Sequence, residues 1–275
     1  MKRNDFIKSI SLATILLADG SILPALGAES FAKKPRLRFV VASDGHYGQD
    51  KTDFEQYYDT LVRQINSQHK EQKFELCVIN GDVIHDRPEF LPLAKKVLDG
   101  LKMPYYVTQG NHDRVSLEVW EQMWGMPFNY DVVVKDNAFI CGTTSDILGK
   151  YLCPDIKWFK QKLDEHKNKK NVFIFIHITP VKWTDNGVEC VEFQDLLKQY
   201  TNIRGVFNGH DHDQEGIKTK DGIPYLFDSH FGGSWGTPYR GFRIVEVKKN
   251  NEVLTYLMNP EVKINEMVIY FFQVC

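Results

Sequence analysis

The sequence predicts an α/β protein with parallel strands in its first half and hairpins in its last part. In the first half, short apolar runs alternate with amphipathic stretches, an order that is typical of a parallel sheet. Near the end, turn signals at 221–222 and 250–251 separate apolar runs at hairpin spacing. The chain has 275 residues, 43% of them hydrophobic, which is enough for a substantial buried core.

Three strand–helix pairs are predicted first. Strands are expected at 37–42, 74–80 and 105–108, with helices after them at about 54–65, 88–101 and 116–124. The helices are predicted from apolar residues at helical spacing, such as Phe54, Tyr58 and Leu61. The following part is expected to hold a hairpin around 136–137, helices at 156–163 and 190–200, and strands at 172–176 and 205–207.

The first 28 residues resemble an export signal peptide. Lys2 and Arg3 precede an apolar run at 10–18, and small residues at 25–28 offer a cleavage zone. Asp19 interrupts the apolar run, so no stable membrane span is expected. We therefore predict an exported protein, located in the bacterial periplasm after removal of the signal.

The export route stays open between two pathways. Residues 3–8 resemble the twin-arginine motif, but Asn4 replaces its second arginine, so the general secretory route is the alternative. The folded domain is expected at 36–260. Residues 261–275 are expected to be a C-terminal tail or edge strand, because their apolar stretch is too short to span a bilayer.

Charge and cysteine content exclude several classes of protein. The net charge is −2 and no basic cluster is present, so a nucleic-acid polymer is not an expected partner. The five cysteines are widely spaced without a CxxC pair, which excludes a zinc knuckle and a dense disulfide framework. One disulfide is compatible with an oxidising compartment, but the spacing does not assign its partners.

Polar clusters follow directly after the predicted strands. They are Asp44-x-His46, Gly81-Asp82, Gly110-Asn111-His112-Asp113, His177 and Gly209-His210-x-His212. Because ligands bind beyond the carboxyl ends of parallel strands, we expect these clusters to share one site. Carboxylates and imidazoles without thiolates suit two metal ions such as Mn, Fe or Zn. Two such ions activate water for phosphoryl displacement, and one carboxylate would bridge them with both oxygens.

The ordered pattern D-x-H, GD, GNHD, H and GHxH from Ser43 to His212 resembles the calcineurin-like metallophosphoesterase family. The resemblance implies a four-layer α/β/β/α sandwich of two mixed sheets flanked by helices, with two divalent or trivalent metal ions at the edge of the sheets. It implies these metal ligands: Asp44, His46 and His212 for the first ion, Asn111, His177 and His210 for the second, and Asp82 between them.

The resemblance also implies catalytic roles. A metal-activated hydroxide attacks phosphorus, and His112 acts as general acid for the leaving oxygen. Asp113 would orient the His112 ring or raise its pKa, and Asn111 would also donate to a phosphate oxygen. Taken singly, Asp113 is equally well a helix N-cap, and His46 or His177 a hydrogen-bonded core histidine. His69 and His166 lie in charged helical stretches and are expected on the surface.

The segment after Asp82 departs from related patterns. His85 stands where purple acid phosphatases place a ligating tyrosine, so a tyrosinate–iron site is disfavoured. We expect His85 and Arg87 to contact a bound phosphate. The alternative for Arg87 is a surface loop in which it pairs with Asp86.

The function predicted from these motifs is hydrolysis of a small phosphate mono- or diester. The alternative is a non-catalytic scaffold of the same fold that acts as a protein-interaction module. Substrate selectivity is expected in the loops 85–90, 145–155 and 229–240, where Trp235 and Tyr239 are candidates to stack on a base or sugar.

Overall fold

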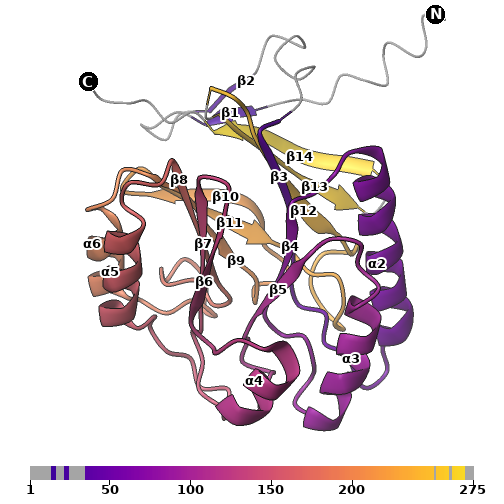
Figure 1. Cartoon of the computed structure of the whole chain (residues 1–275). Coiled ribbons are helices and arrows are strands. Elements are labelled where there is room, and N and C mark those ends of the chain that lie inside the picture. The colour runs from indigo at the N-terminus through magenta and orange to yellow at the C-terminus, as the bar shows by residue number, and fades with distance from the viewer. Residues whose placement is uncertain (1–13, 17–21, 25–34, 251, 260–261, 270–275) are drawn as a thin grey trace, which may run out of the picture.

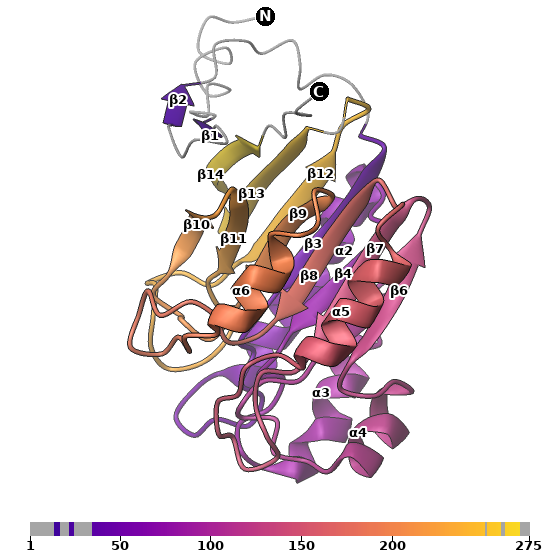
Figure 2. The ribbon, with the colours of Figure 1, turned by 90° about the vertical axis from the view of Figure 1, so that its left-hand side faces the viewer.

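The protein is built of two β-sheets packed face to face, with helices on the outer face of each (Figure 1). The computed structural model describes residues 14–16, 22–24, 35–250, 252–259 and 262–269. Turning the molecule by 90° shows α5 and α6 lying across one sheet, with α2 behind the other (Figure 2). The predicted four-layer α/β/β/α sandwich is confirmed.

The first sheet has eight strands in the order β2-β1-β14-β13-β12-β3-β4-β5. Its parallel part confirms the first-half prediction and comprises β3 (Leu37–Ala42), β4 (Leu76–Asn80) and β5 (Tyr105–Thr108). The antiparallel part comprises β12 (Phe242–Val247), β13 (Val253–Asn259) and β14 (Val262–Ile269), with β1 (Thr14–Leu16) and β2 (Ile22–Pro24) beyond. Its helices are α2 (Phe54–Glu71), α3 (Leu91–Leu98) and α4 (Leu117–Trp124), and the 3-10 turn η2 (Pro88–Phe90) precedes α3.

The second sheet has six strands in the order β10-β11-β9-β8-β7-β6. They are β6 (Tyr130–Val134), β7 (Asn137–Gly142), β8 (Asn171–Ile176), β9 (Ile203–Asn208), β10 (Glu215–Lys220) and β11 (Ile223–Asp228). The helices α5 (Ile156–Glu165) and α6 (Val191–Leu197) cover its outer face. Parallel pairing extends further than predicted, since β7, β8, β9 and β11 are parallel neighbours.

Phenylalanines between the sheets fix the position of one sheet against the other. The Phe39 ring of β3 meets Phe139 and Phe173 of the second sheet edge-on, with centroids 5.1 and 5.0 Å apart. Because side chains alternate along a strand, Val40 of β3 points instead into the core beneath the helices. This packing holds the carboxyl ends of β3 and β4 beside those of β8 and β9.

The predicted terminal segments are described only in part. Most of the predicted signal peptide, at 1–13, 17–21 and 25–28, lies outside the described residues, as does 270–275. β14 pairs with β13 on one side and with β1 on the other. Residues 262–269 thus form a strand that lies inside the sheet and not at its edge, and the predicted domain bounds stay a prediction. Among the described residues, no helix is both long and apolar enough to cross a membrane.

Two histidines predicted on the surface are buried. His69, near the end of α2, accepts a hydrogen bond on Nδ1 from the Phe74 amide at 3.1 Å. His166, after α5, places Nε2 2.7 Å from Asp131 Oδ2. Both imidazoles lie at a helix end and reach a polar group outside the helix, which sequence periodicity does not reveal.

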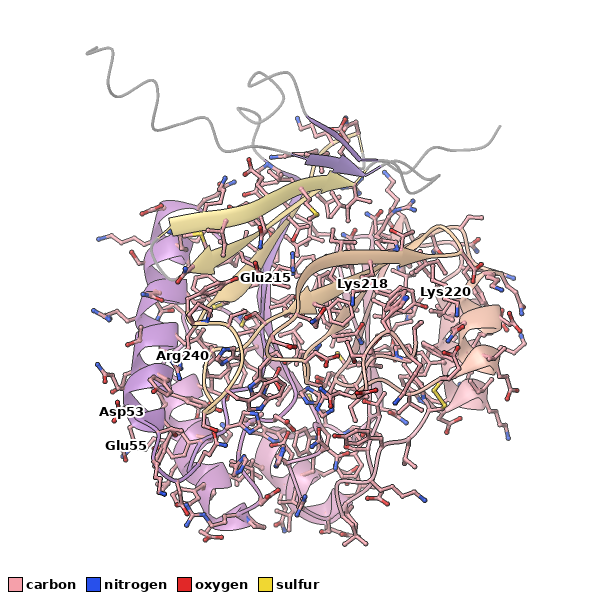
Figure 3. All side chains as sticks on the ribbon, turned by 180° about the vertical axis from the view of Figure 1, so that it is seen from behind. Asp53, Glu55, Glu215, Lys218, Lys220 and Arg240 are labelled. Carbon is pink, nitrogen blue, oxygen red and sulfur yellow. A yellow bond between two sulfur atoms is a disulfide. The ribbon has the colours of Figure 1, made fainter. Side chains whose placement is uncertain are left out.

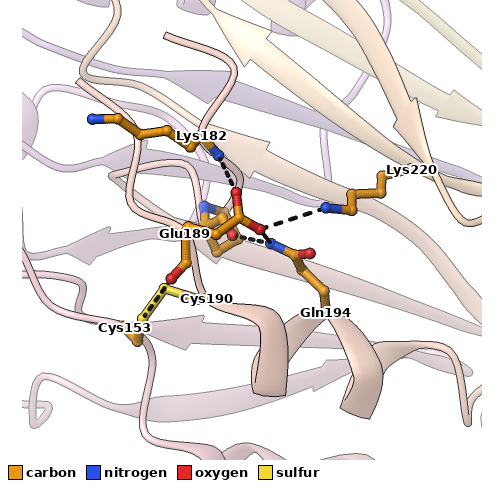
Figure 4. The surroundings of a disulfide bond; sticks show 7 residues. Cys153, Lys182, Glu189, Cys190, Gln194 and Lys220 are labelled. Atoms are coloured by element: carbon orange, nitrogen blue, oxygen red, sulfur yellow. Dashed lines mark hydrogen bonds and ion pairs between the residues drawn. A yellow bond between two sulfur atoms is a disulfide. The ribbon is translucent and has the colours of Figure 1, made fainter. Parts of the chain in front are cut away.

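A disulfide joins Cys153 to Cys190, with 5.6 Å between their Cα atoms (Figure 4). It ties the segment before α5 to the start of α6. Beside it, the Glu189 carboxylate accepts hydrogen bonds from Gln194 at 2.8 Å and the Lys182 amide at 3.1 Å. Cys77 and Cys141 are free and buried. The predicted core position of Cys77 is confirmed.

Candidate metal centre

The predicted polar clusters converge at the carboxyl ends of strands from both sheets. Three of the predicted ligands, Asp44, His46 and His212, form a buried group at the ends of β3 and β9. His46 Nε2 lies 3.0 Å from His212 Nε2, and Asp44 Oδ1 lies 3.1 Å from the same nitrogen. Ligands ~2.1 Å from one ion lie ~3.0–3.4 Å from each other, so this spacing suits a shared cation.

A second buried group contains Asp82, His177 and His210, after β4, β8 and β9. His177 Nε2 lies 3.1 Å from Asp82 Oδ2, and one ligand atom from each residue lies within 4.8 Å of the others. Asn111 is also buried, in the loop that follows β5.

Asp82 lies between the two groups, and its two oxygens have different neighbours. Oδ2 lies 3.1 Å from His177 Nε2 and 3.6 Å from His46 Nε2. Oδ1 instead accepts a 2.8 Å hydrogen bond from the His112 amide. Oδ2 is therefore the oxygen that faces both groups of ligands, while Oδ1 also holds the GNHD loop. The bridging role of Asp82 stays a prediction.

Unpartnered buried atoms show that this donor set fits a cation. Within the described part of the chain, Asp82 Oδ2, Asn111 Oδ1, His177 Nε2 and His210 Nε2 have no hydrogen-bond partner. The 3.1 Å approach of His177 to Asp82 lacks the alignment of a hydrogen bond. Buried polar atoms are rarely left unpaired, and these four belong to the ligands predicted for the second ion. Oxygen and imidazole donors without thiolate suit Mn, Fe or Zn.

Two backbone carbonyls turn imidazole nitrogens toward the site. His177 Nδ1 donates to Asn80 O at 2.7 Å, and His212 Nδ1 donates to Trp235 O at 3.2 Å. Each bond leaves Nε2 directed at the carboxylates. Such a partner on the far nitrogen is the usual way in which a protein orients a metal-binding histidine.

The backbone of the site is strained. Asp44, His46, Asp82 and His210 all have positive φ, between 47° and 68°. This region is costly for residues with a side chain and is found mainly where function requires it. Glycine allows the close contact beside Asp82, since a methyl group at Gly110 would lie 2.2 Å from Asp82 Oδ1.

The charges in the site favour binding of a cation. Burial would raise the pKa values of Asp44 and Asp82, but the surrounding histidines, His177 first among them, together outweigh burial and hold both pKa values well below their usual range. The two carboxylates in turn raise the pKa of His177 to about 10, although burial opposes this. Burial lowers the pKa of His46 to about 3. A metal ion would displace the His177 proton and neutralise the same carboxylates.

His112 is held by Asp86, and the prediction that Asp113 orients it is wrong. His112 Nδ1 lies 2.9 Å from Asp86 Oδ1, and Arg114 Nε lies 3.0 Å from the same oxygen. Asp113 is fully buried and accepts backbone hydrogen bonds from Ile84 and Gly110, both at 2.9 Å. Burial, followed by the charge of Asp82, raises the pKa of Asp113 to about 7. Asp113 therefore joins two loops, while Asp86 positions the imidazole.

His85 reaches the site and Arg87 does not. The His85 ring stacks on His112 at 4.4 Å, and its Nδ1 lies 2.9 Å from His46 Nδ1. Arg87 turns away, donates to the Gly48 carbonyl and pairs with Asp50 at 3.2 Å. The predicted pairing of Arg87 with Asp86 is contradicted, because Asp86 binds His112 and Arg114. The phosphate contact of Arg87 stays a prediction.

The loop 229–241 contributes residues that the motifs do not contain. The His212 ring is stacked on Trp235 at 4.4 Å and on His230 at 4.9 Å. Figure 3 shows Arg240 of this loop beside α2, where its guanidinium lies 4.0 Å over the Tyr57 ring. The sequence indicated a role of loop 229–240 in substrate selectivity, but not that residues of this loop stack on the His212 ring.

The family model for the calcineurin-like phosphoesterases matches residues 37–214. The chain belongs to the calcineurin-like phosphoesterase family. This match covers every predicted ligand, and with the buried metal-site groups it makes the protein a metal-dependent phosphoesterase.

Curated relatives of the chain are phosphodiesterases by name. A probable glycerophosphodiester phosphodiesterase from Arcobacter nitrofigilis is 29% identical over 62% of this chain and 68% of its own length. A probable cyclic nucleotide phosphodiesterase from Psychrobacter arcticus is 22% identical over 64% of this chain and 70% of its own length.

Solved structures share the fold of this metallophosphoesterase. A dimetal phosphatase from Danio rerio superposes with a TM-score of 0.71 at 14% identity, over 87% of this chain and all of that one. GAP50, described as the anchor in the inner membrane complex of Plasmodium, superposes with a TM-score of 0.65 at 17% identity, over 87% and 90%. A phosphatase and an anchor share this architecture, so the fold alone does not decide function.

Proposed function

We propose that the protein is an exported phosphodiesterase that hydrolyses a small phosphate diester at two metal ions. The observation that carries the proposal is the set of unpartnered atoms on Asp82, Asn111, His177 and His210, beside the group of Asp44, His46 and His212. The names of the curated relatives support a diester over a monoester. The donor set accepts Mn, Fe or Zn.

The residues of the chain divide the chemistry among them. The bound metals would supply Lewis acidity and activate water at neutral pH. His112, half-buried beside Asp82, would deliver a proton to the leaving oxygen. Asp86 holds Nδ1 of this ring, so the proton would leave from Nε2. Asn111 would present Oδ1 to a metal and its amide hydrogens to a phosphate oxygen.

A metal-supplemented assay tests the proposal against the scaffold alternative. The protein is incubated with bis(p-nitrophenyl) phosphate and with p-nitrophenyl phosphate in Mn²⁺, Fe²⁺ or Zn²⁺, and bound metal is counted by elemental analysis. We expect two metals per chain and faster release from the diester. Absence of both activity and bound metal would favour the scaffold.

The disulfide supports the proposed export. Stable disulfides belong to oxidising compartments such as the periplasm, and Cys153–Cys190 is one in this chain. The charged start and apolar run of residues 1–18 agree with that location. Mass spectrometry of the native protein should find an N-terminus near residue 29, and an intact Met1 would contradict export.

A further inference from the structure

Two half-exposed aromatic rings flank the metal centre, one on each of the neighbouring ligands His210 and His212. The Tyr151 ring meets the His210 ring edge-on at 4.8 Å. The Trp235 ring stacks on His212 at 4.4 Å, with 5° between the planes. Tyr151 is 38% exposed and Trp235 is 47% exposed, so each ring contacts both a predicted metal-binding histidine and solvent.

Tyr151 lies on a short hairpin with a rigid backbone. Its strands meet at a bridge between Ser145 and Tyr151, extended by a 2.8 Å bond from the Leu152 amide to Thr144 O. The Asp146 carboxylate accepts from two amides of the turn, both at 2.9 Å. The disulfide at Cys153 follows immediately. These contacts hold the backbone on each side of Tyr151.

The tip of this hairpin is apolar and faces solvent. Ile147 is 49% exposed, Leu148 is 76% exposed and Leu152 is 39% exposed. The tip packs against the metal-site loop, since a methyl group at Gly149 would lie 2.5 Å from the Asn111 carbonyl oxygen. Apolar surface beside a polar centre is typical of ligand sites, where it covers the non-reacting part of the ligand.

Trp235 is held by a different loop. Its carbonyl accepts from His212 Nδ1 at 3.2 Å, and Gln49 donates to the neighbouring Ser234 hydroxyl at 3.2 Å. His210 and His212 belong to the two groups of predicted metal ligands, so Tyr151 and Trp235 both border the place where the metals would hold a phosphate.

We propose that Tyr151 and Trp235 form an aromatic clamp that selects phosphodiesters with a planar aromatic ester group. This inference rests on the proposed function and names the substrate class of the same site. Aromatic rings bind other rings through stacked and edge-on contacts, each contributing about 0.5–1.5 kcal/mol beyond buried area. A small polyol or choline ester would leave both rings and the hairpin tip without such contacts.

The test uses three diesters that release the same p-nitrophenolate, so the leaving group is constant. Their second ester groups are methyl, phenyl and 5′-thymidine, which separates a simple aryl ring from a nucleoside. We expect kcat/KM for the phenyl and thymidine diesters to exceed that for the methyl diester at least tenfold. Tyr151→Ala should reduce this preference about fivefold to tenfold, mainly through KM. Tyr200→Ala, a tyrosine packed against Asp164 on the α5–α6 face, is the matched control.

Two results would overturn the clamp. One is a wild-type enzyme that shows no preference among the three diesters. The other is a Tyr151→Ala enzyme that loses the same factor on all of them, which would mean that Tyr151 acts through His210. Trp235→Ala is tested in parallel with its metal content, because loss of metal would identify Trp235 as a support of His212.

Failure of the proposed function gives a different pattern. A wild-type protein that cleaves none of the diesters with any metal refutes catalysis, but calorimetry still measures the clamp. Diphenyl phosphate should then bind the metal-loaded protein at least tenfold more tightly than diethyl phosphate, and Tyr151→Ala should remove most of that difference. Equal binding of the two would refute the clamp.

Discussion

Substitution of Asp86 by asparagine tests how the site protonates a leaving group. Asp86 Oδ1 lies 2.9 Å from His112 Nδ1 and 3.0 Å from Arg114 Nε. Asparagine keeps the size of the side chain but removes the charge, so the His112 ring loses its charged hydrogen bond to Asp86. The ring contacts that remain include the stack on His85 at 4.4 Å and the edge-on contact with His46 at 5.0 Å.

The size of the effect follows from the exposure of the pair. The side chains of Asp86 and His112 are 35% and 26% exposed, so their hydrogen bond is partly screened by water. Such a bond to a charged group contributes about 1–2 kcal/mol. Loss of this energy from the transition state lowers kcat by about 5- to 30-fold, but only where the leaving oxygen needs a proton.

The assay compares leaving groups of increasing basicity. With bis(p-nitrophenyl) phosphate, whose leaving phenolate is stable without a proton, Asp86→Asn should remain within about threefold of wild type. With diphenyl phosphate and an alkyl diester the rate should fall by about 5- to 30-fold. An equal loss on every substrate would refute the role of Asp86 in protonation. Asp113→Asn is the comparison variant: it should lower Tm, since Asp113 joins the Ile84 and Gly110 amides, without changing the dependence on leaving group.

Three other substitutions test the site and the fold. Asp82→Asn should reduce the bound metal found by elemental analysis to less than one ion per chain, and it should lower kcat/KM by about 100-fold or more. A variant that retains two ions would exclude Asp82 as the bridging ligand. Burial alone would raise the pKa of Asp131, but His166 and Lys162 lower it, so the charged carboxylate stabilises the fold above about pH 4 and this stability is lost in acid. Asp131→Asn should remove this pH-dependent stability, and an unchanged acid-unfolding curve would contradict the prediction. Replacing both Cys153 and Cys190 by serine should lower the free energy of unfolding in urea by up to about 3–4 kcal/mol, the loop-closure estimate for a 37-residue separation. A variant with the same urea midpoint as the oxidised wild type would argue against the disulfide.

The sequence predicted which strands end at the site, because each ligand follows an apolar run. Asp44, Asp82 and His177 come directly after β3, β4 and β8, and the topology of parallel strands brings such ends together. Periodicity did not show that these strands belong to two sheets. That division depends on long-range contacts such as Phe39 with Phe173, which no local pattern encodes.

Side-chain direction within loops was the part that could not be predicted. Spacing placed Arg87 and Asp113 near the site and offered Asp86 only as a partner of Arg87, because spacing does not say where a side chain points. Asp86 has φ of 62°, which turns its carboxylate back to His112 and sends Arg87 toward Asp50. The contacts of Trp235 and Tyr151 have no motif, because an aromatic residue in a loop is also ordinary packing.

The cost of this site argues for catalysis over a scaffold role. Four predicted ligands have positive φ, a backbone strain that costs about 1–3 kcal/mol per residue. In addition, the carboxylates of Asp44 and Asp82 are both buried. Backbone bonds between the loops hold this arrangement, from the Asp44 amide to Gly81 O at 3.1 Å and from the Gly209 amide to His177 O at 3.0 Å. A protein that used only its surface would be more stable with apolar residues at these positions. The strained, charged and unpartnered donors of this chain become favourable only when cations bind between them, and a bound cation pair is what phosphoester hydrolysis requires.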